Sequence, residues 1–235
     1  MEGTIVDLLA WRAPEQLRDF LLAWAERRSS TWADAARQAL ERGASKGHVP
    51  QCRGQLRFHL GETAVAQASR DVGAGCLPMQ TVAPGATFMV ARLGRFALVN
   101  QVLRSRDHLP RRSVTRRLLS QPNVEIDPQG ALALGDSNTG SVKTELAYFG
   151  CLVTVPCRSD PTVPGELAIA VPSRSIDRWI AWLPLHTVHA LLQNGAGGQN
   201  GRDQYRSSPE IPDRALPTFR VPKEGKEGGD NDPES

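Results

Sequence analysis

The spacing of hydrophobic positions predicts helices at the start of the chain. Between residues 14 and 28 these positions recur every three or four residues, as on one face of a helix. The pattern resumes over residues 32–40, after Ser29 and Ser30, either of which can cap a helix. We therefore expect two antiparallel amphipathic helices, followed by a loop and by a weaker helix over residues 62–72.

Strand-like patterns take over from residue 87. Two apolar runs flank Gly94 and predict a β-hairpin over residues 87–102. A continuous apolar run at residues 167–171 lies between turn signals, and this suits a buried strand better than a helix. Further strands are expected at residues 124–126, 131–134 and 145–155.

A helical period returns before the composition changes near residue 193. Ser173 or Ser175 can cap a helix whose apolar residues share one face. Those apolar residues are Ile176, Trp179, Ile180 and Leu183.

The order of elements, helices first, then strands, then a helix, is that of an α+β fold. We expect N-terminal helices packed on a small, mostly antiparallel sheet, with a C-terminal helix. One globular domain is predicted over residues 1–193, helical in 1–75, mostly strand in 86–172 and helical in 174–193.

Residues 194–235 form a compositionally different tail. Gly, Pro and charged residues dominate it, so it has too few apolar side chains to offset the entropy lost on ordering. We expect this tail to be disordered. A short apolar island around Phe219 could still dock on a partner protein.

Composition narrows the class of protein. The chain is 40% hydrophobic and 23% charged, which is ordinary for a globular protein. No run approaches the about 20 apolar residues that cross a bilayer, so no membrane contact is expected. Its four cysteines are too few for a disulfide framework, which favours a cytoplasmic protein with reduced thiols. Only four of the 28 basic residues are lysines, and this excess of arginine is typical of GC-rich bacterial genomes.

The distribution of charge is more informative than its total. The segment from Arg104 to Arg117 holds six arginines against Asp107, and its net charge of +5 equals the positive excess of residues 1–193. Guanidinium groups at this density repel one another unless an anion binds to them, and nucleic-acid phosphate is the commonest such anion. The candidate nucleic-acid or anion-binding residues are Arg104, Arg106, Arg111, Arg112, Arg116 and Arg117.

Two interpretations of this segment stay open. In the first, residues 111–119 form a helix with Arg112 and Arg116 on one face, while Leu118 and Leu119 help to anchor the other side. In the second, the segment is a solvated loop whose arginines pair internally with Glu125 and Asp127. The segment has no interleaved aromatic residues and no helix-turn-helix or RNA-binding fingerprint, so the evidence for nucleic acid is electrostatic.

A second constellation suggests metal-dependent hydrolysis. Glu125 and Asp127 would lie on one face of a strand, with Lys143 and Glu145 following later in the chain. Two carboxylates and a lysine can hold magnesium and activate water. The restriction-nuclease pattern, however, places the acid before the lysine, whereas Lys143 precedes Glu145 here. These four residues are the candidate catalytic set of a magnesium-dependent nuclease.

No metal site or cofactor motif emerges from the sequence. His48, Cys52, His59 and Cys76 lack the closely paired spacing of a structural zinc site, so we expect neither a metal nor a cofactor.

The leading hypothesis is a non-enzymatic, DNA-binding or otherwise nucleic-acid-associated accessory or regulatory protein. The alternative is a protein-interaction or small-anion sensor module without nucleic-acid binding, and a nuclease comes third. A protein partner could contact Trp179 and Trp182, which share a predicted helix, or the tail near Phe219.

Overall fold

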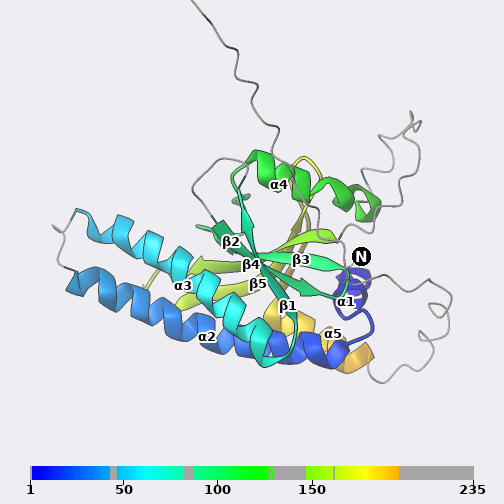
Figure 1. Cartoon of the computed structure of the whole chain (residues 1–235), viewed down its shortest axis with the longest axis horizontal. Coiled ribbons are helices and arrows are strands. Elements are labelled where there is room, and N and C mark those ends of the chain that lie inside the picture. The colour runs from blue at the N-terminus through cyan, green and yellow to red at the C-terminus, as the bar shows by residue number, and fades with distance from the viewer. Residues whose placement is uncertain are drawn as a thin grey trace, which may run out of the picture.

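The fold is a six-stranded sheet covered by helices on both faces (Figure 1). A computed structural model describes residues 2–42, 47–81, 87–127, 129, 147–160 and 162–195. It has the α+β architecture that the order of elements predicts.

The strands follow chain order across the sheet, and four of the five pairings are antiparallel. The exception is β3 with β4, which are parallel, so two three-stranded meanders lie side by side. The strands are β1 (Gly75–Gln80), β2 (Thr87–Leu93), β3 (Phe96–Val102), β4 (Tyr148–Pro156), β5 (Pro164–Pro172) and β6 (Trp179–Pro184).

Four helices cover one face of the sheet, and two short helical segments lie on the other. The first group is α1 (Glu2–Leu9), α2 (Pro14–Glu41), α3 (Val49–Asp71) and α5 (Leu185–Gly195). The second group is α4 (Val114–Leu119) and the 3₁₀ segment η1 (Gln121–Ile126), which belong to the crossover between β3 and β4 (Figure 1). Leu119 of α4 lies in the core of this face, whereas Ile126 at the end of η1 packs against the core of the first face. The long α2 and α3 pack against each other as a hairpin (Figure 1).

Each face of the sheet has its own core. On the α2 and α3 side, Phe20 and Trp24 pack against strand residues such as Leu98 and Leu152. On the opposite side, Leu119 of α4 packs with the alternate residues of the same strands. Because β3, β4 and β5 are buried on both faces, their sequences read as continuous apolar runs.

The sequence pattern predicts both long helices as shorter than they are. Residues 14–28 and 32–40 form one helix and not two, because the Ser29 hydroxyl donates to the Ala25 carbonyl (2.9 Å) within the helix and caps nothing. The helix expected at residues 62–72 begins at Val49. Its packed face carries polar residues, so its hydrophobic period is weak.

The prediction of a helix across residues 174–193 is wrong in its first half, where β6 lies. A register shift between Val171 and Pro172 places Pro172 opposite Trp179 and Val171 opposite Ala181. This irregularity puts Trp179 and Trp182 in one core, at a spacing that also suits a helix. Pro184 ends the strand, and α5 follows.

The other strand predictions have mixed outcomes. The hairpin over residues 87–102 and the strands near 145–155 and 167–171 are confirmed as β2 to β5. The strand expected at 124–126 is wrong, since these residues belong to η1, and β1 was not expected. The strand expected at residues 131–134 and the tail beyond Gly195 lie outside the described residues.

We expect Gly94→Ala to destabilise the protein strongly. Gly94 turns β2 into β3 with φ of +53°, and an added Cβ would overlap the carbonyl oxygens of Leu8 and Leu9 at the end of α1. Left-handed strain and the clash together should lower the free energy of unfolding by about 2 kcal/mol or more, measured by urea titration. Gly54→Ala is the matched control, because its Cβ meets open space in α3 and should stabilise by at most about 1 kcal/mol. Equal effects of the two changes would contradict the prediction.

Candidate functional site: an arginine surface

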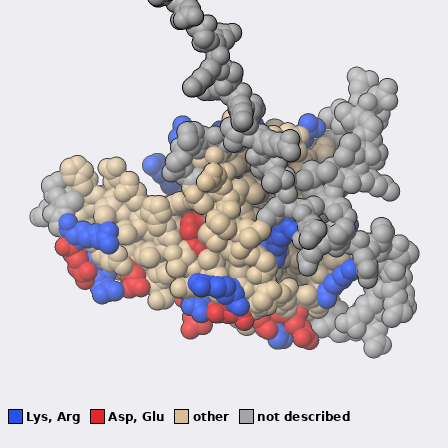
Figure 2. Space-filling model, viewed as in Figure 1, with Lys and Arg blue, Asp and Glu red and all other residues tan. Residues whose placement is uncertain are grey.

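Six arginines between the end of β3 and the end of α4 form the candidate site, called here the arginine surface. They are Arg104, Arg106, Arg111, Arg112, Arg116 and Arg117, and all but Arg116 are exposed. In the face shown by Figure 2, a few basic side chains lie at the edge of the molecule where Figure 1 places α4, whereas both signs mix along α2. The charge concentration read from the sequence is therefore present on the folded surface.

Polar side chains hold α4 and η1 on the sheet. Ser113 caps α4, because its hydroxyl accepts from the backbone N–H of Arg116 (3.2 Å). Buried Asn123 donates through Nδ2 to the carbonyls of Phe149 (2.9 Å) and Pro172 (2.7 Å), and its Oδ1 accepts from the N–H of Phe149 (2.8 Å). One amide thus bonds the backbones of both β4 and β5 and holds η1, which directly follows α4, on the sheet.

The connection between β5 and β6 lies against the arginine surface. Arg112 Nε donates to the carbonyl of Ile176 (3.1 Å), and the Ser120 hydroxyl donates to the carbonyl of Arg174 (2.7 Å). Ile176 is fully buried and has φ of +55°, which a β-branched residue rarely adopts. Such strain persists only where surrounding contacts determine the conformation, so this connection is held in place.

Trp179 reaches the arginine surface from the start of β6. Its Nε1 donates to the carbonyl of Arg106 (3.1 Å), and its ring meets that of Trp182 edge to face at 5.5 Å. The Arg106 guanidinium lies 5.9 Å from the Trp182 ring centroid. Trp179 stays partly exposed, whereas Trp182 is 4% exposed and donates to Glu166 (2.8 Å).

From the sequence, Arg174 was not singled out, and Trp179 was singled out only as a contact for a protein partner. Exposed Arg174 and partly exposed Trp179 lie far along the chain from the arginine segment and join it only through tertiary contacts. Nothing in their local sequence signals this. The absence of aromatic residues from the segment itself is therefore misleading, because the fold supplies one.

The arginine surface is not neutralised by ion pairs among the described residues, although exposed Asp107 lies in the same segment. None of its six guanidinium groups forms an ion pair with a described carboxylate. Asp127 pairs with Arg178, and Glu125 accepts from the Tyr148 hydroxyl (3.0 Å). The internal pairing weighed from the sequence is thus not formed by these two acids.

Arg116 differs from the other five arginines. Because α4 begins two residues after Arg112, these two side chains do not share a helical face, contrary to prediction. Arg116 is partly buried, its Nη1 donates to the Arg111 carbonyl (3.0 Å), and burial lowers its pKa. Leu119 anchors α4 as expected, but Leu118 is 40% exposed. Arg116 therefore has a structural role beside any role in binding.

A second polar cluster lies inside the protein, between α2, α3 and the sheet. Fully buried Arg28 donates through Nε to the Thr154 hydroxyl (2.8 Å) and through Nη1 to the Arg57 carbonyl (2.8 Å). Its guanidinium lies 4.9 Å from the Trp32 ring centroid. Burial, and then the neighbouring Arg57, lowers the pKa of Arg28 to about 10. Arg28 thus joins α2, α3 and β4 through one side chain.

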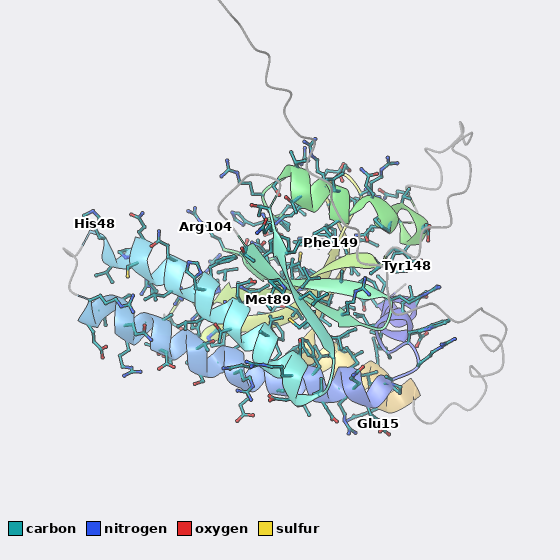
Figure 3. The ribbon with its side chains drawn as sticks, in the orientation of Figure 1. Glu15, His48, Met89, Arg104, Tyr148 and Phe149 are labelled. Carbon is teal, nitrogen blue, oxygen red and sulfur yellow. The ribbon has the colours of Figure 1, made fainter. Side chains whose placement is uncertain are left out.

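Glu62 enters the same region from α3. The described pairing of β2 with β3 joins only residues 90–93 to residues 96–99, so the N–H of Met89 has no partner on β3. The Glu62 carboxylate accepts this N–H instead, at the point where α3 crosses β2 (Figure 3). Burial raises the pKa of Glu62, although the Met89 N–H, Asn100 and Arg28 act in the opposite direction.

The candidate nuclease residues are only partly described. Glu125 is exposed and Asp127 is 5% exposed, and they lie in and just after η1 and not on one strand. Lys143 and Glu145 lie outside the described residues, so this hypothesis stays a prediction. Within the described part of the chain, no three His, Cys, Asp or Glu side chains are grouped to hold a metal ion.

Comparison with protein-family models, with curated proteins and with solved structures finds no match for this chain. In the described ranges, no helix is long and apolar enough to cross a membrane.

Glu62→Gln should show the effect of the buried carboxyl on stability. Because the pKa of Glu62 is raised on folding, the folded state binds more protons and wild-type stability falls as pH rises above the carboxyl's ordinary value of 4.5. Gln keeps an oxygen for the Met89 N–H but cannot ionise. The melting temperature of Glu62→Gln, relative to that of wild type, should therefore rise between about pH 4 and about pH 7. Circular dichroism measures both melting temperatures.

The matched control is Glu26→Gln, at an exposed position of α2. Its difference from wild type should change little over the same range. A constant difference between Glu62→Gln and wild type at all pH values would contradict the assignment of a raised pKa to Glu62.

Proposed function

We propose that this protein binds nucleic acid through the phosphate groups of its backbone, using the arginine surface. The observation that carries the proposal is that six clustered arginines, five of them exposed, have no ion pair with any described carboxylate. In such a cluster each guanidinium raises the electrostatic free energy of its neighbours. A polyanion relieves this repulsion.

The arrangement of the arginines favours a polymer with many anionic groups over a ligand with a single one. Arg104 and Arg106 follow β3, Arg111 precedes α4 and Arg117 lies in its last turn, so the charges come from several places along the crossover. The backbone carbonyl of exposed Arg174 accepts from the Ser120 hydroxyl at the end of α4, so a further arginine lies near this surface. A polymer with regularly spaced phosphates can engage several such charges at once, and each contact adds a salt-dependent increment of affinity.

The contacts that this surface offers recognise charge and not base sequence. Its exposed groups are guanidinium donors, and no element of eight residues or more presents them for insertion into a groove. Phosphate contacts position a protein on nucleic acid but carry no sequence information directly. The proposed role is accordingly that of an accessory protein that binds nucleic acid with little sequence preference.

We expect the fourfold change of Arg104, Arg106, Arg111 and Arg117 to Ala to abolish most of this binding. These four are chosen because they are exposed and their side chains make no hydrogen bond within the described structure. Their loss should reduce the slope of log affinity against log salt by roughly three to four, since each phosphate contact contributes about one. Fluorescence anisotropy with labelled DNA and RNA at several salt concentrations measures this slope.

A second fourfold variant controls for net charge. Arg18, Arg37, Arg42 and Arg70 are also exposed but lie on α2 and α3 or directly after α2. Changing them to Ala should leave most of the affinity and the slope intact. Equal losses in the two variants would show a diffuse charge effect, and unchanged binding in the first variant would refute the proposal.

A further inference from the structure

We infer that the bound polymer is single-stranded nucleic acid and that Trp179 is a stacking platform for one of its bases. The inference rests on the proposed function and adds to it the class of nucleic acid and a base-contacting residue. It starts from a contact that the sequence does not reveal, the junction between Trp179 and the backbone of Arg106.

The position of Trp179 suits this role. It is partly exposed at the start of β6 and lies next to Arg106. Arg106 and Arg104 are both exposed. A base stacked on the indole would hold its own phosphate close to guanidinium groups of the arginine surface. Proteins that bind single-stranded nucleic acid combine the same two features, a row of basic side chains for the phosphates and aromatic rings for the bases.

The ring of Trp179 is held from two sides. Its Nε1 donates to the Arg106 carbonyl (3.1 Å), and the edge-to-face contact with Trp182 (5.5 Å) restrains the ring plane. Trp182 in turn is buried and bonded to Glu166. A platform fixed in this way loses little conformational entropy when a base stacks on it.

The hydrogen bond of Trp179 also limits what it can recognise. Indole has one donor, and here the Arg106 carbonyl already accepts it. Trp179 therefore has no donor left for the edge of a base and can contribute only through its π face. Every base has such a face, so stacking should tolerate any sequence. In a duplex the faces of internal bases are stacked on one another, which makes an unpaired strand the fitting ligand.

The test compares Trp179→Leu, Trp179→Phe and wild type by fluorescence anisotropy. The probes are labelled single-stranded DNA, single-stranded RNA and duplex DNA of equal length, each at several salt concentrations. Trp179→Leu removes the aromatic face and should weaken binding to both single strands on the order of tenfold. Trp179→Phe loses the bond to the Arg106 carbonyl but keeps a ring, so it should retain most of the affinity.

The salt slope separates stacking from phosphate contact. Both Trp179 variants should keep the wild-type slope, because no guanidinium is removed. Duplex DNA should bind wild type more weakly than single strands do, and Trp179→Leu should not weaken it further. A direct readout is the intrinsic tryptophan fluorescence, which stacked bases should quench in wild type more than in Trp179→Phe.

Trp11→Leu is the matched control. Trp11 is also partly exposed beside an arginine, with the Arg95 guanidinium 4.8 Å from its ring centroid, but it lies between α1 and α2 on the opposite side of the sheet. This variant should bind all probes like wild type. Melting temperatures of all variants show whether a loss of binding reflects a loss of fold.

The outcomes separate the two proposals. If wild type binds with a steep salt dependence and Trp179→Leu binds single strands equally well, the stacking inference is wrong and the phosphate-binding proposal stands. Tighter binding of duplex than of single strands would also overturn the inference alone. If wild type binds none of the probes, both proposals are refuted.

Discussion

The fold depends on a cation that has no direct counter-ion. Arg28 is fully buried; its Nε donates to a hydroxyl and its Nη1 to a carbonyl, and its Nη2 has no hydrogen-bond partner among the described residues. A charge removed from water in this way is costly unless its surroundings are fixed around it. The helix hairpin and the parallel strand β4 must therefore meet in one register, since any slip would leave the charge buried and unbonded.

This constraint explains features that lie close to Arg28. Gly61 leaves room for it, because a Cβ there would come within 2.6 Å of both Arg28 Nη1 and Asn100 Nδ2. The guanidinium also requires α2 to continue without a break past Ser29, since Trp32 contacts it one turn later. The polar side chains that specify this geometry replace apolar ones on α3, and for that reason the hydrophobic period of α3 is weak.

The sequence predicted what depends on local pattern and charge. Strands β3, β4 and β5 were found because burial on both faces makes them apolar throughout, and the arginine surface was found because its charge is contiguous in the chain. The strand β6 was missed because its two tryptophans have a spacing that suits a helix. The strand accommodates this spacing through an irregular register. The position of Arg174 and Trp179 beside the arginine segment was missed because only tertiary contacts bring them there, and a single sequence carries no sign of such contacts.

The parallel pairing of β3 with β4 divides the sheet into two halves that are joined only by a long connection. Each meander joins strands that are close in sequence, whereas β3 and β4 meet only after a connection of 45 residues, Leu103 to Ala147, is closed. Closure of such a loop costs entropy before any ladder bond is made, so the two meanders can form separately and unite late. Asn123 sits inside that connection and bonds both β4 and β5. It therefore shortens the open loop, and the assembly of the arginine surface coincides with the joining of the two halves.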